Sequence, residues 1–437
     1  MALGAGAYSY VDELNIGDES YAVKIPIKDE NSDGDYGNFA EISIMSSLTG
    51  MPSIVGIEHI MMTSSISSFI DLREEAANNA YCILMKKGIP LSELATSLDE
   101  SKKLKIWKRI VIDIAIGLYI LHKSRIVHCD IKLDNIIYYG PTEFDEINDD
   151  SSFCITDFGI ARFYCYKDDA IDIDMIPLHL RPNELYNVKP RLNYFIDIYD
   201  LGIMLYEFMY GDIFTESDIP LKNKETFMKM KSNDLKFYVK KIINSKVKKI
   251  TDKELKQFIE SLIADKDRPK ASQILELPIF KDYKHLINNK LEKINNTISD
   301  YSCYPLTPEI LLKYKTFIRN CIQYETIHNN RRLTHHTIVT MVRYLETKED
   351  INSIDISLCT MAVVFICQGL LNSHSNQTPL NNFVKDNVNA FIEMVDDIMN
   401  SLDFKIFHVT IYEFQDYTEY EHEKEKEYLN SIISIIS

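Results

Sequence analysis

Two short polar segments constrain this chain more than any other feature of its sequence. The first runs from His128 to Asn135 (HCDIKLDN), and the second begins twenty-two residues after Asn135 and runs from Asp157 to Gly159 (DFG). In the first segment an aspartate, a lysine and an asparagine can orient a hydroxyl group, neutralise a phosphate and hold a metal ion. The aspartate of the second segment can supply another metal ligand. In this order and at this spacing, the two segments predict a phosphoryl-transfer site.

A glycine-containing segment lies upstream and precedes a short apolar segment with a lysine. It runs from Gly4 to Val11 (GAGAYSYV), and the apolar segment runs from Ser20 to Ile25 (SYAVKI). Alternating apolar residues around the glycines predict a β-hairpin whose turn lets backbone amides approach phosphates, with Lys24 on the following strand. By itself this signal is weak, since two neighbouring glycines most often mark an ordinary turn.

Three further segments have the apolar patterns of regular structure. Phe39 to Leu48 has apolar residues at helical spacing and a carboxylate, Glu41, near its start. Tyr81 to Met85 is apolar throughout, as expected of a buried strand, and Leu104 to His122 has helical spacing again and leads into the HCDIKLDN segment. Glu41 is either a solvated helical side chain or the partner of Lys24.

Charged residues farther along the chain complete the series. Glu184 ends the segment RPNE, Asp197 begins DIYDLG, and Arg268 lies within ADKDRP. The whole series of motifs resembles the eukaryotic protein kinases over residues 3 to about 284. The resemblance implies an α+β, bilobal protein kinase fold (residues 1–284), with a small β-rich lobe (1–85) and a large helical lobe (86–284).

The resemblance also implies ATP and Mg²⁺ as cofactors, a protein as the substrate, and a role for each matching residue. Asp130 would accept the proton of the substrate hydroxyl, and Lys132 would balance charge on the transferred phosphoryl group. Asn135 and Asp157 would hold Mg²⁺. The residues that would surround the nucleotide are Leu3, Gly4, Gly6, Val11, Ala22, Lys24, Glu41, Met85, Lys86, Gly88 and Ile137. Those that would support the large lobe are Asp197 and an ion pair of Glu184 with Arg268.

The pattern Asp-x-Lys-x-x-Asn resembles the kinases that act on serine or threonine, because tyrosine kinases have arginine and alanine in this segment. Within that group the stretch from Asp157 to Glu184 resembles the cyclin-dependent kinases. It has the 28-residue length expected for that family, and Asp172 stands sixteenth, where the family has its activating threonine.

Of the three arginines that would bind the phosphothreonine in that family, only Arg162 is present, and Cys129 and Ala40 occupy the other two positions. A carboxylate carries about one charge and needs fewer arginines than a phosphate with about two. We therefore interpret Asp172, paired with Arg162, as a permanent substitute for the phosphothreonine. The alternative is that the three changes are unrelated. Tyr8 stands where inhibitory phosphorylation occurs in the family.

Other departures leave a second function open. Ser9 replaces the third glycine of the glycine-containing segment, and Pro177 replaces a threonine that would contact Asp130 and Lys132. A pseudokinase whose domains form a binding scaffold is therefore the alternative to an enzyme. Catalysis is favoured because a scaffold has no need to retain all six residues of the active series, namely Lys24, Glu41, Asp130, Lys132, Asn135 and Asp157.

The last third of the chain predicts an all-α domain. Residues 285–305 are rich in asparagine and lysine and are assigned to a linker, and residues 306–437 form the helical domain and a charged C-terminal tail. Helical spacing recurs in a series of segments: Pro308–Ile322, Thr334–Tyr344, Ile354–Leu371, Val384–Leu402 and a start near Thr410. Their order resembles a single cyclin box, which implies an intramolecular contact with the kinase and activation in cis. An unrelated helical regulatory domain is the alternative, since apolar stripes usually mean only core.

Composition excludes some partners. The chain has 437 residues, 46% of them apolar, a formal charge of −17 and a pI near 5.2, so a nucleic acid or an anionic membrane is not expected to bind it. The eight cysteines show no paired zinc-site spacing, and there is no signal-peptide or transmembrane run. We expect an intracellular protein in the cytoplasm or nucleus, of the host cell if the protein is viral.

Overall fold

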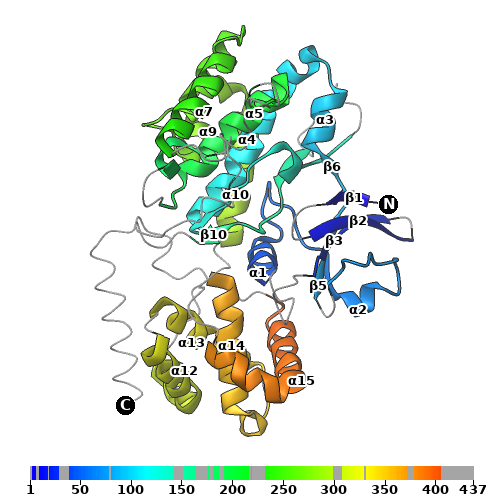
Figure 1. Cartoon of the computed structure of the whole chain (residues 1–437), viewed down its shortest axis with the longest axis vertical. Helices are drawn as coiled ribbons and strands as arrows, with labels where there is room; N and C mark the ends of the chain where they lie inside the picture. Colours follow the sequence, from blue (N-terminus) through cyan, green and yellow to red (C-terminus); the bar gives the residue numbers. More distant parts are fainter. Residues whose placement is uncertain are drawn as a thin grey trace. The chain divides into compact units, whose positions relative to one another are not determined.

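The computed structural model describes residues 2–5, 9–17, 19–28, 39–77, 80–141, 151–163, 176, 181–186, 191–215, 218, 232–298, 308–328, 331–371 and 378–404. The chain divides into two units (Figure 1). The first unit comprises Met1–Thr49, Gly56–Lys86 and Asp300–Ser437, and the second comprises Gly50–Val55 and Lys87–Ser299. Among the described residues, no helix is both long and apolar enough to cross a membrane.

The sheet of the first unit has five antiparallel strands in the order β1-β2-β3-β5-β4. These strands are β1 (Ala2–Ala5), β2 (Ser9–Ile16), β3 (Glu19–Pro26), β4 (His59–Met62) and β5 (Tyr81–Lys86). The hairpin predicted around the glycines corresponds to β1 and β2, which pair antiparallel, and Lys24 lies on the following strand, β3. In the turn between β2 and β3, Gly17 adopts φ +63°, where a glycine is unstrained. Between β4 and β5 lies α2 (Thr63–Ile66), which the sequence patterns did not predict.

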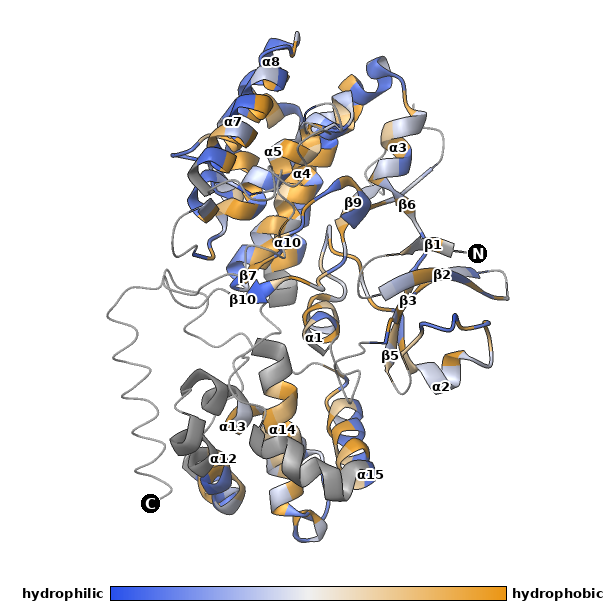
Figure 2. Cartoon of the chain, viewed as in Figure 1, coloured by the Kyte–Doolittle hydropathy of each residue, from blue (hydrophilic) through white to orange (hydrophobic). Residues whose placement is uncertain are grey.

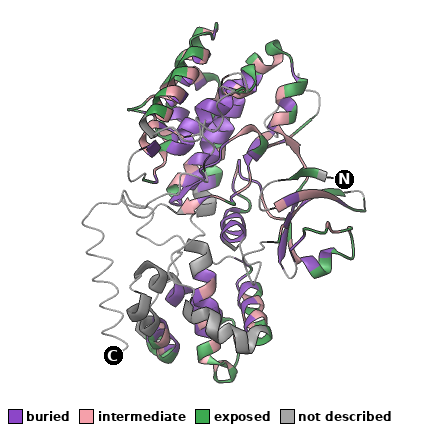
Figure 3. Ribbon diagram, in the orientation of Figure 1, coloured by how far each residue is buried: buried purple, intermediate pink, exposed green. Residues whose placement is uncertain are grey.

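Helix α1 (Phe39–Leu48) belongs to the same unit and is buried along its length. Every residue from Ala40 to Leu48 is buried (Figure 3), whereas a surface helix normally exposes one face. Helix α14 packs against α1, which accounts for part of this burial. The sequence of α1 fits such an environment, because it contains one charged residue, Glu41.

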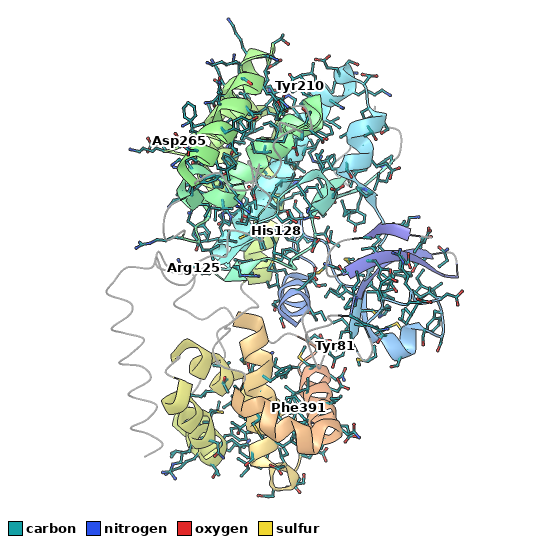
Figure 4. All side chains as sticks on the ribbon, in the orientation of Figure 1. Tyr81, Arg125, His128, Tyr210, Asp265 and Phe391 are labelled. Atoms are coloured by element: carbon teal, nitrogen blue, oxygen red, sulfur yellow. The ribbon has the colours of Figure 1, made fainter. Side chains whose placement is uncertain are left out.

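The C-terminal helices of the first unit pack around α14. They are α11 (Pro308–Lys313), α12 (Lys315–His328), α13 (Arg331–Glu346), α14 (Ile356–Leu371) and α15 (Thr378–Ser401). Helix α14 packs against α12, α13 and α15, so its apolar sequence is surrounded by neighbours (Figure 2). Tyr81 of β5 donates its hydroxyl to Asp396 of α15, and its ring lies edge-on to Phe404, 5.2 Å away between centroids (Figure 4).

The second unit is mainly helical and is centred on α4 (Glu100–Lys123) and α5 (Phe195–Tyr210), whose ribbons are mostly apolar in Figure 2. The other helices of this unit are α3 (Leu91–Ser97), α7 (Ser232–Val247), α8 (Lys253–Leu262), α9 (Ala271–Glu276) and α10 (Lys284–Ile298). Short 3-10 helices lie at Leu133–Asn135, Asn183–Tyr186 and Pro278–Tyr283. Asp99 caps α4 by accepting a hydrogen bond from the backbone nitrogen of Lys102 at 2.9 Å.

Two small sheets of the second unit adjoin the loops that contain the two polar segments. One has the strand order β6-β8-β9, and the other pairs β10 with β7. The strands are β6 (Ile89–Pro90), β7 (Ile126–Val127), β8 (Ile136–Tyr139), β9 (Ser152–Ile155) and β10 (Arg162–Phe163). Because β7 ends just before His128, and β8 and β9 flank Asn135 and Asp157, the two polar segments of the sequence lie at strand ends.

Helix α10 occupies most of the range that the sequence analysis assigns to a linker. Asp113 of α4 is fully buried and accepts hydrogen bonds from Lys290 of α10 at 2.7 Å, from Arg109 at 3.1 Å and from the backbone nitrogen of Phe153 at 3.0 Å. Residues 285–298 are therefore part of the second unit. The described C-terminal helices, in turn, share a unit with the β-sheet and do not form a third one.

Candidate active site

Asp197, near the start of α5, organises the loop that follows β7. Its Oδ1 accepts a hydrogen bond from the backbone nitrogen of Cys129 at 2.8 Å, and its Oδ2 accepts one from that of His128 at 3.0 Å. The same Oδ2 lies 2.9 Å from Nε2 of His122. Cys129 has φ +67°, a conformation that costs energy for a non-glycine residue, and the two hydrogen bonds to the buried carboxylate hold the backbone in it.

His128 links this loop to the segment that contains Asp157 (Figure 4). Its Nε2 lies 3.0 Å from the carbonyl oxygen of Thr156, and its Nδ1 lies 3.3 Å from the backbone nitrogen of Asp130. Only a neutral ring with its proton on Nε2 satisfies both contacts, because the first partner accepts and the second donates. The ring also packs against Phe158 at 5.1 Å between centroids.

The carboxylate of Asp130 has one anchored oxygen and one without a partner. Oδ2 accepts hydrogen bonds from Lys132 Nζ at 2.7 Å and from Asn135 Nδ2 at 2.8 Å. Asn135 Nδ2 also donates to the backbone carbonyl of Asp130 at 2.9 Å, which fixes the loop around the side chain. The buried Oδ1 has no hydrogen-bond partner within the described part of the chain. A held carboxylate with one unengaged oxygen can accept a proton from a bound hydroxyl group.

Asn135 and Asp157 present oxygen atoms suited to a magnesium ion. The backbone nitrogen of Thr156 donates to the carbonyl of Asn135 at 3.0 Å, and this bond brings the two residues to neighbouring strand ends. Because the side-chain nitrogen of Asn135 is engaged with Asp130, its amide oxygen is the atom left for a ligand. Asp157 adds a carboxylate and adopts φ +64°. A carboxylate and an amide oxygen are ligands that Mg²⁺ accepts, so these residues fit the ion.

In the first unit, Lys24 of β3 pairs with Glu41 of α1. The distance between Nζ and Oε1 is 2.6 Å, and the side chains are 12% and 5% exposed, so Glu41 is not a solvated residue. Lys24 lies opposite Val11 of β2 and Ile83 of β5 in the sheet register. Ala22 lies opposite Met85, which is buried near the end of β5.

The connector that begins with Lys86 contains a glycine that other residues cannot replace without rearrangement. A Cβ atom on Gly88 would lie 2.3 Å from the side chain of Ile137 and 2.8 Å from the carbonyl oxygen of Tyr138. The connector therefore approaches β8 more closely than a side chain permits. Gly88 and Ile137, both predicted to contact the nucleotide, are thus in contact with each other.

The ion pair of Glu184 and Arg268 is present, but only one partner is fully buried. The two contacts measure 2.5 Å and 3.1 Å, and Arg268 also donates to the carbonyl of Phe195 at 3.1 Å. The Arg268 side chain is 4% exposed, whereas that of Glu184 is 28% exposed. Water can therefore solvate the carboxylate if the arginine is removed, which makes that loss less costly than it would be for a fully buried pair.

Four residues that the sequence analysis singles out lie outside the described residues, namely Gly6, Tyr8, Asp172 and Pro177. Leu3 and Gly4 lie on β1, and Arg162 begins β10, opposite Val127. Cys129 and Ala40 are both buried, at 1% and 8% exposure.

The sequence analysis did not identify two polar residues near the catalytic loop, one half-buried and one buried. His122 contacts Asp197, as described above, and Asp200 is fully buried one turn farther along α5. Burial, together with the nearby carboxylates of Asp197 and Asp130, raises the pKa of Asp200, so its neutral form is favoured. A signal was present, because the segment DIYDLG places its two aspartates three residues apart on one helix.

Comparison with known proteins agrees with this geometry. The family model described as "Protein kinase domain" matches residues 1–280. The "Leucine-rich repeat serine/threonine-protein kinase 1" of Mus musculus is 28% identical over 186 residues, which are 37% of this chain and 9% of that protein. The "Serine/threonine-protein kinase ppk25" of Schizosaccharomyces pombe is 30% identical over 122 residues, which are 28% of this chain and 26% of that protein.

A longer match is to the "DNA damage response protein kinase DUN1" of Saccharomyces cerevisiae, which is 24% identical over 330 residues. These cover 69% of this chain and 60% of that protein, so the chain spans less than two thirds of each of these three relatives. The family model nevertheless covers more than half of the chain and includes every motif from the glycine-containing segment to Arg268. Two of these three relatives are serine/threonine-protein kinases by name, and the chain belongs to the protein kinase family.

Proposed function

We propose that the chain is an enzyme that transfers the γ-phosphoryl group of ATP to serine or threonine in protein substrates. The observation that carries this proposal is the geometry of Asp130, whose Oδ2 is held by Lys132 and Asn135 while its Oδ1 has no partner within the described residues. The unengaged oxygen would accept the proton of the attacking hydroxyl group. Lys132, already 2.7 Å from this carboxylate, would offset negative charge on the transferred group.

Asn135 and Asp157 would hold the magnesium ion, which neutralises charge on the phosphates when it is bound. Lys24 would bind the α- and β-phosphates, and Glu41 would hold the lysine in position through the 2.6 Å contact. A kinase does little covalent chemistry of its own and works by positioning and electrostatic stabilisation. Retention of all six residues therefore favours an enzyme over a scaffold.

We test this function with purified full-length protein, labelled ATP, Mg²⁺ and a generic basic protein substrate. Asp157→Asn keeps the size of the side chain but removes a charge from the metal site, so turnover should fall by about 10²-fold or more. Asp134→Asn in the same 3-10 helix as Asn135 is the matched control, because Asp134 has no role in the proposed site, and it should retain activity. Equal turnover in the wild type and Asp157→Asn, with contaminating kinases excluded, would favour the scaffold.

We propose further that the C-terminal helices act in cis, as a cyclin-like activator of a kinase related to the cyclin-dependent kinases. Support comes from α14, which packs against α1, the helix that bears Glu41. Such a contact biases α1 toward the arrangement in which the Lys24–Glu41 pair forms. A tether makes weak docking sufficient, because it raises the effective concentration to about millimolar.

A further inference from the structure

The first unit contains a segment that covers one face of its sheet and that has no role in the function above. Residues 63–77, here called the cover segment, include α2 and return along the sheet to β3. Its residues Ile66 and Ala76 join the buried cluster formed by Tyr10, Leu14, Val23, Ile25, Cys82 and Leu84. Side chains alternate between the faces of a strand, so the face beneath the cover segment includes Tyr10 and Asp12 of β2. Val11 and its cross-strand neighbour Lys24 lie on the opposite face, where the nucleotide is predicted to bind.

Arg73 of the cover segment makes three contacts with β2. Its guanidinium lies 4.2 Å from the centre of the Tyr10 ring, and its Nη2 lies 3.3 Å from Oδ1 of Asp12. Its backbone nitrogen donates to the hydroxyl of Tyr10 at 3.2 Å. Tyr10 is fully buried, Asp12 is 14% exposed and the Arg73 side chain is 29% exposed, so water screens these contacts less than those of a surface pair.

The cover segment is also attached to the end of β3 that lies beside Tyr10. The backbone nitrogen of Ala77 donates to the carbonyl of Pro26 at 2.8 Å, and that of Lys28 donates to the carbonyl of Glu75 at 2.8 Å. Pro26 lies opposite Ser9, the first residue of β2. Both hydrogen bonds therefore lie near the end of the β2–β3 pair at which β2 begins.

On its other side β2 pairs with β1, and this pairing shifts register between Ala2 and Gly4. The position of β2 over the nucleotide face thus depends on β3 and on the cover segment as well as on β1. We propose that Arg73 is a positioning residue for ATP, which acts through Tyr10 and Asp12 to hold β2, and with it Val11, against the nucleotide. This inference rests on the proposed kinase function but concerns a residue that touches neither ATP nor protein substrate.

The test compares variants of the full-length protein by steady-state kinetics and by binding of a fluorescent, non-hydrolysable ATP analogue. Arg73→Ala should raise the KM for ATP about fivefold and weaken analogue binding by a similar factor, equivalent to roughly 1 kcal/mol, with kcat at saturating ATP little changed. Arg73→Lys keeps the charge near Asp12 but loses the flat group over the ring, so its KM should be intermediate. Glu75→Gln is the matched control, because Glu75 lies 3.7 Å from Arg73 and is 47% exposed, and it should match the wild type.

A merely structural role for Arg73 predicts a different result, namely a lower melting temperature and a smaller active fraction at an unchanged KM, and that result would overturn the inference. If Arg73→Ala does not fold, Tyr10→Phe and Asp12→Asn each remove one contact and should each raise the KM about twofold; an unchanged KM in both would also overturn it. A wild type that binds the analogue but transfers no phosphoryl group would contradict the proposed function alone. In that case the analogue affinities still decide the role of Arg73.

Discussion

At the scale of single residues, buried carboxylates determine how the second unit is organised. Asp197 holds two backbone nitrogens of the catalytic loop, and Asp113 joins three elements through one side chain. Both are fully buried and fully engaged, which is the condition under which a buried charge is tolerated. Glu207 differs from them, because among the described residues its carboxylate accepts a single hydrogen bond, from a backbone nitrogen.

Glu207 of α5 gives a prediction about stability and pH. Burial raises the pKa of this carboxyl to about 7, although it accepts a hydrogen bond from the backbone nitrogen of Ile213 at 3.3 Å. A carboxyl whose pKa is higher in the folded protein favours folding below the unfolded-state pKa near 4.5, and this contribution is lost as the pH rises toward 7. Glu207→Gln should therefore raise the melting temperature of the protein at pH 8 but change it little at pH 4.5.

The measurement is thermal unfolding of both proteins at the two pH values. Glu260→Gln, at an exposed position of α8, is the control and should not alter the difference between them. An equal shift at both pH values would mean that the glutamine acts through packing and not through ionisation.

At the scale of elements, strong periodic patterns were sufficient to predict most of the helices and strands of the described structure. The strand at Ser20 to Ile25, the helix at Phe39 to Leu48 and the described helices between Pro308 and Ser401 lie where the sequence predicts them. The helix predicted to start near Thr410 lies outside the described residues. Helix α10 was missed because its composition is polar and because its principal tie, Lys290 to Asp113, joins residues 177 positions apart. The cover segment was missed for a related reason, since its contact from Arg73 to Tyr10 joins residues 63 positions apart in the sequence.

The candidate site likewise contains residues that the sequence could predict and a residue that it could not. Motif spacing predicted Asp130, Lys132, Asn135 and Asp157 as site residues, because kinase chemistry requires these residue types in this order. It could not identify Arg73, since the cation over Tyr10 depends on a contact between residues that no motif relates. Local patterns therefore find residues that the chemistry needs, whereas supporting residues emerge only from tertiary packing.

The segment after Asp157 gives the prediction at this scale. Asp172 lies outside the described residues, so its pairing with Arg162 as a substitute for a phosphothreonine stays a prediction. Asp172→Asn and Arg162→Gln should each lower activity about threefold, because an exposed carboxylate–arginine pair contributes only about 0.2–1 kcal/mol. The double variant should be no worse than either single one.

Kinetic assays before and after phosphatase treatment provide the check. Treatment should leave the wild type unchanged, because a carboxylate cannot be dephosphorylated. Inactivation by the phosphatase would mean that a phosphorylated residue activates the kinase. Full activity of Asp172→Asn would mean that Asp172 has no part in activation.

At the scale of the whole molecule, the sequence predicts a kinase followed by a separate helical domain, whereas the described structure groups those helices with the β-sheet. This grouping affects where the chain can be cut. A truncation near Asn289 would remove Lys290 and leave Asp113 buried with one fewer partner, at a cost of about 1–3 kcal/mol. A truncation after Ser299 keeps α10 and removes only the C-terminal helices.

Residues 1–299 should therefore be soluble and able to bind ATP, but should turn over about tenfold or more slowly than the full chain, because α1 lacks α14. Adding residues 300–437 as a separate polypeptide should restore part of the activity at micromolar concentrations. Full activity of residues 1–299 alone would mean that the C-terminal helices do not activate the kinase and have another function, such as the recruitment of substrates.

The burial of α1 also has a consequence for synthesis on the ribosome. Helix α1 is made early, but α14, which packs against it, lies more than 300 residues farther along the chain. At translation rates of about 5–20 residues per second, α14 is synthesised roughly 15–60 s after α1, and during this interval the apolar surface of α1 lacks this neighbour. The burial of α1 therefore cannot be complete until α14 has been synthesised, and a chaperone that shields α1 during this interval would increase the yield of native protein.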